Sequence, residues 1–116
     1  MYPQVLRNNA ARKFEPSCRI HRNCLPFRRL NGEDHYTQQF NLCMDAFQKG
    51  EAFLVESTLE TPVLAERLRA DFVNLDKMLV VECQVTESKE SIDRKRGIWN
   101  KHGLEMMTYE EWKKEN

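Results

Sequence analysis

Residues 69–85 read RADFVNLDKMLVVECQV and contain two apolar segments separated by a short polar break. Apolar segments of this length, rich in Val, Leu and Phe, are typical of buried strands, and the break at 74–77 is short enough for a hairpin turn. The first segment carries Asp71, and the second carries Glu82 and Gln84 on one face, because residues i and i+2 of a strand point the same way. Two carboxylates that converge from neighbouring strands are a typical arrangement for binding a hard divalent cation.

Regular elements are expected on both sides of this hairpin. The residues Tyr36, Phe40, Cys43 and Phe47 recur at helical spacing, which assigns them to the buried face of a first helix that ends at Gly50. The expected elements are a helix over 34–49, strands over 52–58, 69–75 and 77–86, a helix from the Ser88 cap to about His102, a strand over 104–108 and a helical turn over 109–116. This α-β-β-β-α-β order predicts an α/β fold in which helices flank a mixed sheet.

Charge is unevenly distributed along the chain. Residues 1–30 contain seven Arg and Lys residues against one Glu, a charge of +6, so the remaining 86 residues carry −6. Because prolines interrupt residues 1–30 and no periodicity is visible, we expect an extended or loosely folded basic arm there, with packing on the domain or on a partner left open, followed by a domain over 31–116. A basic arm favours a polyanion partner, while the alternative is a solvated tail that balances the charge of the domain. The arm residues expected to contact phosphates are Arg12, Lys13, Arg22, Arg28 and Arg29.

Length and cysteine content narrow the class of protein. A chain of 116 residues forms one domain, its apolar runs are too short to span a bilayer, and its first residues lack the apolar region of a signal peptide. A soluble, cytoplasmic protein with no membrane partner is therefore expected. Cys18 and Cys24 leave a zinc site and a disulfide open as alternatives, although no second pair follows at zinc-ribbon spacing. Cys43 and Cys83 lie on apolar faces and are expected in the core.

The order of elements and the polar residues resemble the PD-(D/E)xK nuclease superfamily over residues 33–108. Within it, the chain is most similar to the competence-associated CoiA-like nucleases and, more distantly, to the small archaeal Holliday-junction resolvases. Ala70-Asp71 corresponds to the Pro-Asp of the family, and Glu82-Cys83-Gln84 corresponds to its Glu-x-Lys, in the Glu-x-Gln form that some branches carry. The basic helix and strand over 91–104 match as well. Glu33 and His35 fit the upstream Glu or His that several branches place on the first helix.

The resemblance implies a restriction-endonuclease-like core and a metal-dependent nuclease acting on DNA. The carboxylates of Asp71 and Glu82, with the backbone carbonyl of Cys83, would bind Mg²⁺ or Mn²⁺, and His35 would add a further ligand. Gln84 would orient the attacking water where the family has a Lys, and Glu33 is a further catalytic candidate. Related resolvases form symmetric dimers, which implies a homodimer. The helix that follows would contact phosphates through Lys89, Arg94 and Lys95.

Other functions remain open on the sequence alone. Loss of the family Lys accompanies loss of cleavage in other branches, so one alternative is a nucleic-acid-binding protein that keeps the nuclease fold without cleaving. Another is an interaction module whose arm binds an acidic protein. Glu82 could also be an ordinary polar residue of an exposed strand face, with Asp71 paired to Arg69 or Arg67. Glu56 is expected to pair with a neighbouring Arg, and Trp99 and Trp112 are expected to be packing residues.

Overall fold

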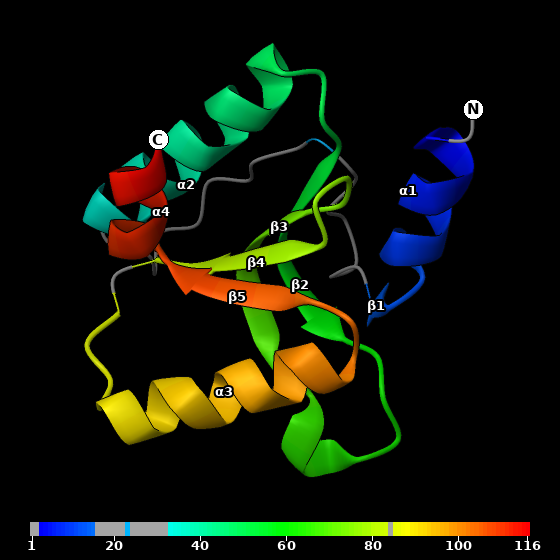
Figure 1. The fold of residues 1–116 in the computed structure, drawn as a ribbon, viewed down its shortest axis with the longest axis vertical. Coiled ribbons are helices and arrows are strands. Elements are labelled where there is room, and N and C mark those ends of the chain that lie inside the picture. Colours follow the sequence, from blue (N-terminus) through cyan, green and yellow to red (C-terminus); the bar gives the residue numbers. More distant parts are fainter. Residues whose placement is uncertain (1–2, 16–22, 24–32, 84) are drawn as a thin grey trace.

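A computed structural model describes residues 3–15, 23, 33–83 and 85–116 (Figure 1). Within these residues five strands form one sheet in the order β1-β2-β3-β4-β5. Neighbouring strands are antiparallel except β4 and β5, which are parallel and joined through a helix. The predicted α/β class with a mixed sheet is therefore confirmed. The strands are β1 (Phe14–Glu15), β2 (Phe53–Leu59), β3 (Arg69–Asn74), β4 (Leu79–Glu82) and β5 (Glu105–Thr108).

Helices cover both faces of this sheet (Figure 1). Alternation along β4 divides the core, because Val80 packs in one apolar cluster and Val81 in the other. The first cluster includes residues of α1 and α3, and the second includes residues of α2 and α4. No helix in the described part of the chain has both the length and the apolar character needed to cross a bilayer. The helices are α1 (Pro3–Ala11), α2 (Glu33–Gln48), α3 (Lys89–Lys101) and α4 (Tyr109–Glu115), with the short 3-10 helix η1 (Leu64–Glu66) between β2 and β3.

From α2 onward the predicted elements occur in the predicted order. Ser88 caps α3 and accepts a hydrogen bond from the backbone N of Ser91, as its position before the helix indicated. The turn between β3 and β4 is closed by Asn74, whose Oδ1 accepts from the backbone N of Asp76 and of Lys77. The main difference is in β4, which is shorter than the predicted 77–86 because Cys83 lies beyond its last paired residue.

The N-terminal segment corrects the expectation of an extended or loosely folded arm. Pro3 is the first residue of α1, where the N–H that proline lacks would have had no helical partner. Phe14 pairs with Leu59 of β2, is only 3% exposed, and contacts the Trp99 ring at a centroid distance of 5.9 Å. Ala10 is buried in the same cluster. Residues 3–15 therefore belong to the folded core, whereas the greater part of the segment 16–32 lies outside the described residues.

The buried face of α2 also differs from the prediction. Phe40 and Phe47 are 53% and 69% exposed, whereas Leu42 and Ala46 are buried. Gln39 is buried as well, and its Nε2 donates a hydrogen bond of 3.0 Å to the backbone oxygen of Asp71. A buried amide needs such a partner, so this bond helps to set the rotation of α2 about its own axis. The apolar spacing alone placed the two phenylalanines on the wrong face.

Candidate active site

Asp71 and Glu82 come together where strands β3 and β4 separate. The last paired residues at this end of the ladder are Phe72 and Val81, so Asp71 and Glu82 occupy the next position along each strand. Beyond this pair the Asp71 side chain takes over the contact between the strands, because its Oδ2 accepts a hydrogen bond of 2.8 Å from the backbone N of Cys83. The charge and hydrogen bonding of the Asp71 side chain also raise the pKa of the Glu82 carboxyl group. The hairpin thus brings two acids into direct contact.

The environment of Glu82 favours its protonated form. Glu82 is buried, with only 6% of its surface exposed. Burial, and then the charge and hydrogen bond of Asp71, raise the pKa of Glu82 to about 9, while the Lys95 ammonium and a hydrogen bond from the Asp71 backbone act in the opposite direction. At neutral pH, and with no cation bound, the Glu82 carboxyl group therefore keeps its proton. A cation could replace that proton.

His35 is the third ionisable side chain beside this pair, and α2 brings it there. Its Nε2 lies 3.8 Å from Asp71 Oδ1, which is longer than a hydrogen bond. The same nitrogen is buried and has no hydrogen-bond partner within the described structure. Glu33 is the first residue of α2, but its side chain, like the whole of Gln84, falls outside the description. Among the described residues, no three His, Cys, Asp or Glu side chains lie close enough together to form a metal-binding group.

The residues present fit Mg²⁺ or Mn²⁺ better than a metal that needs many protein ligands. Mg²⁺ keeps several waters and is commonly bound by one or two carboxylates together with substrate phosphates. Asp71 and Glu82 can supply those carboxylates, and the backbone of Cys83 follows directly. Two ionised carboxylates that lie close together repel each other unless a proton or a cation neutralises one of the charges. The unpaired Nε2 of His35 adds a nitrogen that would favour Mn²⁺ over Mg²⁺.

Lys95 lies closer to the site than its predicted role on a phosphate-binding surface suggested. Its side chain is 23% exposed, its Nζ lies 2.5 Å from Glu87 Oε1, and its charge lowers the pKa of Glu82. Lys89 and Arg94, which share the predicted role, are exposed on α3. The sequence contained an indication that Lys95 faces the core rather than the solvent. Lys95 lies three residues after Ile92 and four before Trp99, which places it on the apolar side of α3.

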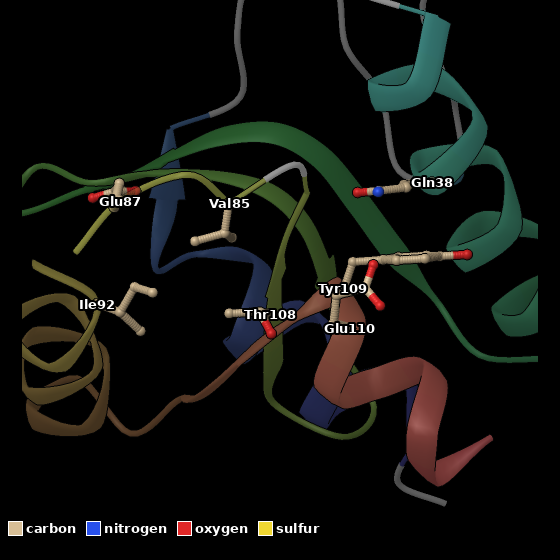
Figure 2. Close-up of a pocket in the computed structure, with 7 residues that line it drawn as sticks. All are labelled: Gln38, Val85, Glu87, Ile92, Thr108, Tyr109 and Glu110. Atoms are coloured by element: carbon tan, nitrogen blue, oxygen red, sulfur yellow. The ribbon is translucent and has the colours of Figure 1, made fainter. Parts of the chain in front are cut away.

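A cavity of about 280 Å³ is lined by residues of α2, α3, β5 and α4 and of the segment between β4 and α3 (Figure 2). Figure 2 shows Gln38 of α2 and Tyr109 of α4 on one side, with Val85, Glu87 and Ile92 on the other. Val85 is three residues after Glu82, but neither Glu82 nor Asp71 lines this cavity. Since Glu87 and Glu110 both line it, an unshielded phosphate would be repelled there. The full lining is Gln38, Val85, Glu87, Ile92, Thr108, Tyr109 and Glu110.

The arginines near Asp71 have other partners. Arg69 forms an ion pair of 2.6 Å with the buried carboxylate of Glu56, which confirms that Glu56 pairs with a neighbouring Arg. Arg67 donates from Nε to the backbone oxygen of Thr61 at 2.9 Å. The alternative in which Asp71 pairs with either arginine is therefore wrong, and Asp71 remains available to Glu82.

The other chemically notable side chains are structural. Cys43 and Cys83 are buried in the core cluster under α2, as expected, and burial raises the pKa of the Cys43 thiol to about 12 and also raises that of Cys83. Trp99 is fully buried, and Trp112 packs on Tyr109 with ring centroids 5.6 Å apart. Cys18 and Cys24, for which the sequence leaves a zinc site and a disulfide open, lie outside the described residues, as do Arg22, Arg28 and Arg29.

Comparison with known proteins gives no relative on which to base an assignment. The chain matches no protein-family model, no curated protein and no solved structure. Any statement about function therefore depends on the geometry of Asp71, Glu82 and their neighbours.

Proposed function

We propose that this protein is a metal-dependent nuclease that hydrolyses phosphodiester bonds in DNA, on a restriction-endonuclease-like core. The main support is the contact between the carboxyl groups of Asp71 and Glu82 at the point where β3 and β4 separate. The order α2-β2-β3-β4-α3-β5 is the one that the PD-(D/E)xK resemblance implies. The basic residues of the first 30 positions supply charge that suits a nucleic-acid partner.

Each residue has a distinct role in this proposal. Asp71, Glu82 and the carbonyl of Cys83 would hold Mg²⁺ or Mn²⁺, with the Glu82 carboxyl group ionised. A bound cation of this kind makes a coordinated water more acidic and neutralises charge that develops on the phosphate. Gln84 orients the attacking water through its amide. Gln84 is neutral, so the positive charge near the site comes from Lys95, which lowers the pKa of Glu82.

The first prediction tests the carboxylate pair by isosteric substitution. D71N and E82Q should each abolish divalent-dependent cleavage of DNA, because each removes a charged oxygen ligand while keeping side-chain shape. The measurement is cleavage of labelled duplex and branched DNA with Mg²⁺, with Mn²⁺ and with EDTA. E110Q is the matched control, since Glu110 is an exposed carboxylate that lines the cavity of Figure 2, and it should cut at the wild-type rate. If both D71N and E82Q cleave DNA at the wild-type rate, Asp71 and Glu82 are not the active-site carboxylates.

The second candidate function is nucleic-acid binding without cleavage. Gln84 at the position of the family Lys is the observation that favours it. Under this alternative the wild-type protein binds DNA with a steep salt dependence but leaves it intact with either cation. The same cleavage assay, run beside a binding assay, separates the two functions. Homodimer formation stays a prediction, which sedimentation at several concentrations would test.

A further inference from the structure

A second hollow, of about 520 Å³, lies away from the carboxylate pair and is lined by two arginines. Arg12 follows the end of α1, and Arg67 follows η1, so segments far apart in the sequence form its walls. Glu60, Thr61 and Pro62 line the rest of it. Neither Asp71 nor Glu82 takes part.

Backbone contacts hold the two walls together. β1 pairs with β2 through Phe14 and Leu59, and the backbone N of Glu60 donates to the backbone oxygen of Lys13 at 2.8 Å. The bond from Arg67 Nε to Thr61 O fixes the direction of that guanidinium. The direction of the Arg67 guanidinium is therefore set before any ligand binds, which lowers the entropic cost of binding, while Arg12 has its backbone fixed at the end of α1 and its side chain exposed.

The hollow carries an excess of positive charge. Neither Arg12 nor Arg67 forms an ion pair with any carboxylate of the described chain, and Glu60 is the only acid among the lining residues. Two guanidinium groups against one carboxylate leave a net charge of +1. Within the described residues, Nε is the one guanidinium nitrogen of Arg67 that donates a hydrogen bond, and an Arg fork matches the spacing of phosphate oxygens.

We propose that Arg12 and Arg67 form a binding site for a phosphate group. A phosphate dianion suits the site better than a carboxylate, because it offers three or more acceptor oxygens to two separate forks. The site goes beyond the proposed nuclease activity, since it needs neither the carboxylate pair nor a metal ion. The phosphate group can belong to a small free compound or to the backbone of a nucleic acid.

Pyrophosphate is a suitable probe because it carries the chemistry without nucleic acid. We expect pyrophosphate, added to the full-length protein in EDTA at constant ionic strength, to raise the melting temperature, and R12Q/R67Q to weaken the apparent affinity at least about tenfold. K113Q/K114Q is the matched control, because it removes two exposed charges from α4, and it should bind like the wild type. R12K/R67K, which keeps the charge and loses the forks, should bind with intermediate affinity. Unchanged binding by R12Q/R67Q with a normal circular dichroism spectrum would overturn the site.

Two further arms identify the source of the phosphate and separate this site from the nuclease proposal. Displacement of pyrophosphate by duplex DNA in the wild type supports the site and assigns it to a nucleic-acid backbone, while resistance to displacement supports it and assigns it to a free phosphate compound. D71N should bind pyrophosphate with wild-type affinity. Loss of binding in D71N, at an unchanged melting temperature, would contradict a site independent of the carboxylates.

Discussion

The buried carboxyl group of Glu82 lies beside a second one, that of Asp71, at the end of the β3–β4 ladder. A protein that needed only stability would gain little from this arrangement, because burial and like charge both oppose ionisation. Lys95 offsets part of the repulsion from α3, and it is itself paired with Glu87. Perturbed carboxyl groups of this kind are more frequent at functional sites than elsewhere.

Stability without metal should depend on the charge state of Glu82. The pKa of Glu82 is raised from 4.5 to about 9 in the folded protein, so the folded state binds more protons than the unfolded state between these values, and the free energy of unfolding falls as pH rises through that window. The slope should not exceed about 1.4 kcal/mol per pH unit. E82Q should flatten it and be the more stable protein at pH 8. The measurement is urea unfolding in EDTA at pH 5, 6.5 and 8.

The exposed residue Glu105 provides the control for that series. E105Q removes a carboxylate of the same type from the surface of β5, so it should keep the wild-type pH dependence. A wild-type protein as stable at pH 8 as at pH 5 would show that Glu82 is ionised without cost.

Lys95 should contribute to the rate of cleavage. We expect K95Q to slow cleavage by roughly 10- to 1000-fold, the range for loss of one group that stabilises transition-state charge. Under the proposed function, Q84K should be active, and the double variant K95Q/Q84K should recover much of the loss, because a positive charge returns two residues after Glu82. R94Q on the exposed face of α3 is the control. A K95Q protein that cuts at full rate would confine Lys95 to its ion pair with Glu87.

At the scale of elements, α3 is bounded by local signals and held by one large side chain. Ser88 caps its N-terminus, and Gly103, with φ of +83°, follows the C-cap residue His102. The backbone N of Leu104 donates to the oxygen of Trp99 across this glycine, which is the hydrogen bond of a Schellman motif. Trp99 then anchors the helix in the core by packing against Phe14 of β1. The ends of α3 are local properties, whereas its position depends on a residue 85 positions earlier in the chain.

Two glycines of this region should respond oppositely to substitution by alanine. G103A should destabilise the protein by about 1 kcal/mol, because alanine is strained at positive φ. G97A should stabilise it by up to about 1 kcal/mol, because Gly97 is an exposed interior residue of α3 and its added Cβ meets no atom within 4 Å. Chemical denaturation of both variants beside the wild type measures the difference. A stabilised G103A would show that the motif at the end of α3 relaxes without cost.

For the whole molecule, three of the cations among residues 1–30, namely Arg7, Arg12 and Lys13, lie in the described segment 3–15, which folds as α1 and β1 with the connection between them. Arg7 lies on α1 and forms an ion pair of 2.8 Å with Asp76 in the β3–β4 turn, and it also donates to the backbone oxygen of Gly50. Phe14 lies in the core. Deletion of residues 1–30 would therefore remove core contacts as well as charge, so the charge is better tested by substitution.

The salt dependence of DNA binding measures how many of these charges contact phosphates. If Arg22, Arg28 and Arg29 each contact one phosphate of duplex DNA, their replacement by Gln should reduce the slope of log affinity against log salt by about 2.7, or roughly 0.9 each. K113Q/K114Q should leave the slope unchanged. Equal slopes for the triple variant and the wild type would assign the phosphate contacts to the exposed basic residues of α3, which include Lys89 and Arg94.

Sequence alone predicted the features that depend on neighbours along the chain. The apolar runs of β3 and β4, the short turn at Asn74 and the cap at Ser88 follow from local pattern and side-chain chemistry. The contact between Asp71 and Glu82 also follows, because a short turn fixes the register of a hairpin and therefore decides which residues meet. These features need few contacts across the molecule.

Tertiary structure decided everything that depends on residues far apart in the chain. α1 and β1 fold because Ala10 and Phe14 find a core built by later elements, and α2 is rotated so that Gln39 can reach Asp71. The high pKa of Glu82 likewise arises from its burial and from Asp71, and Lys95 of α3 lowers it in part. The hollow between Arg12 and Arg67 exists only because β1 pairs with β2. Burial and charge at each of these places are sums over distant neighbours, which no local pattern contains.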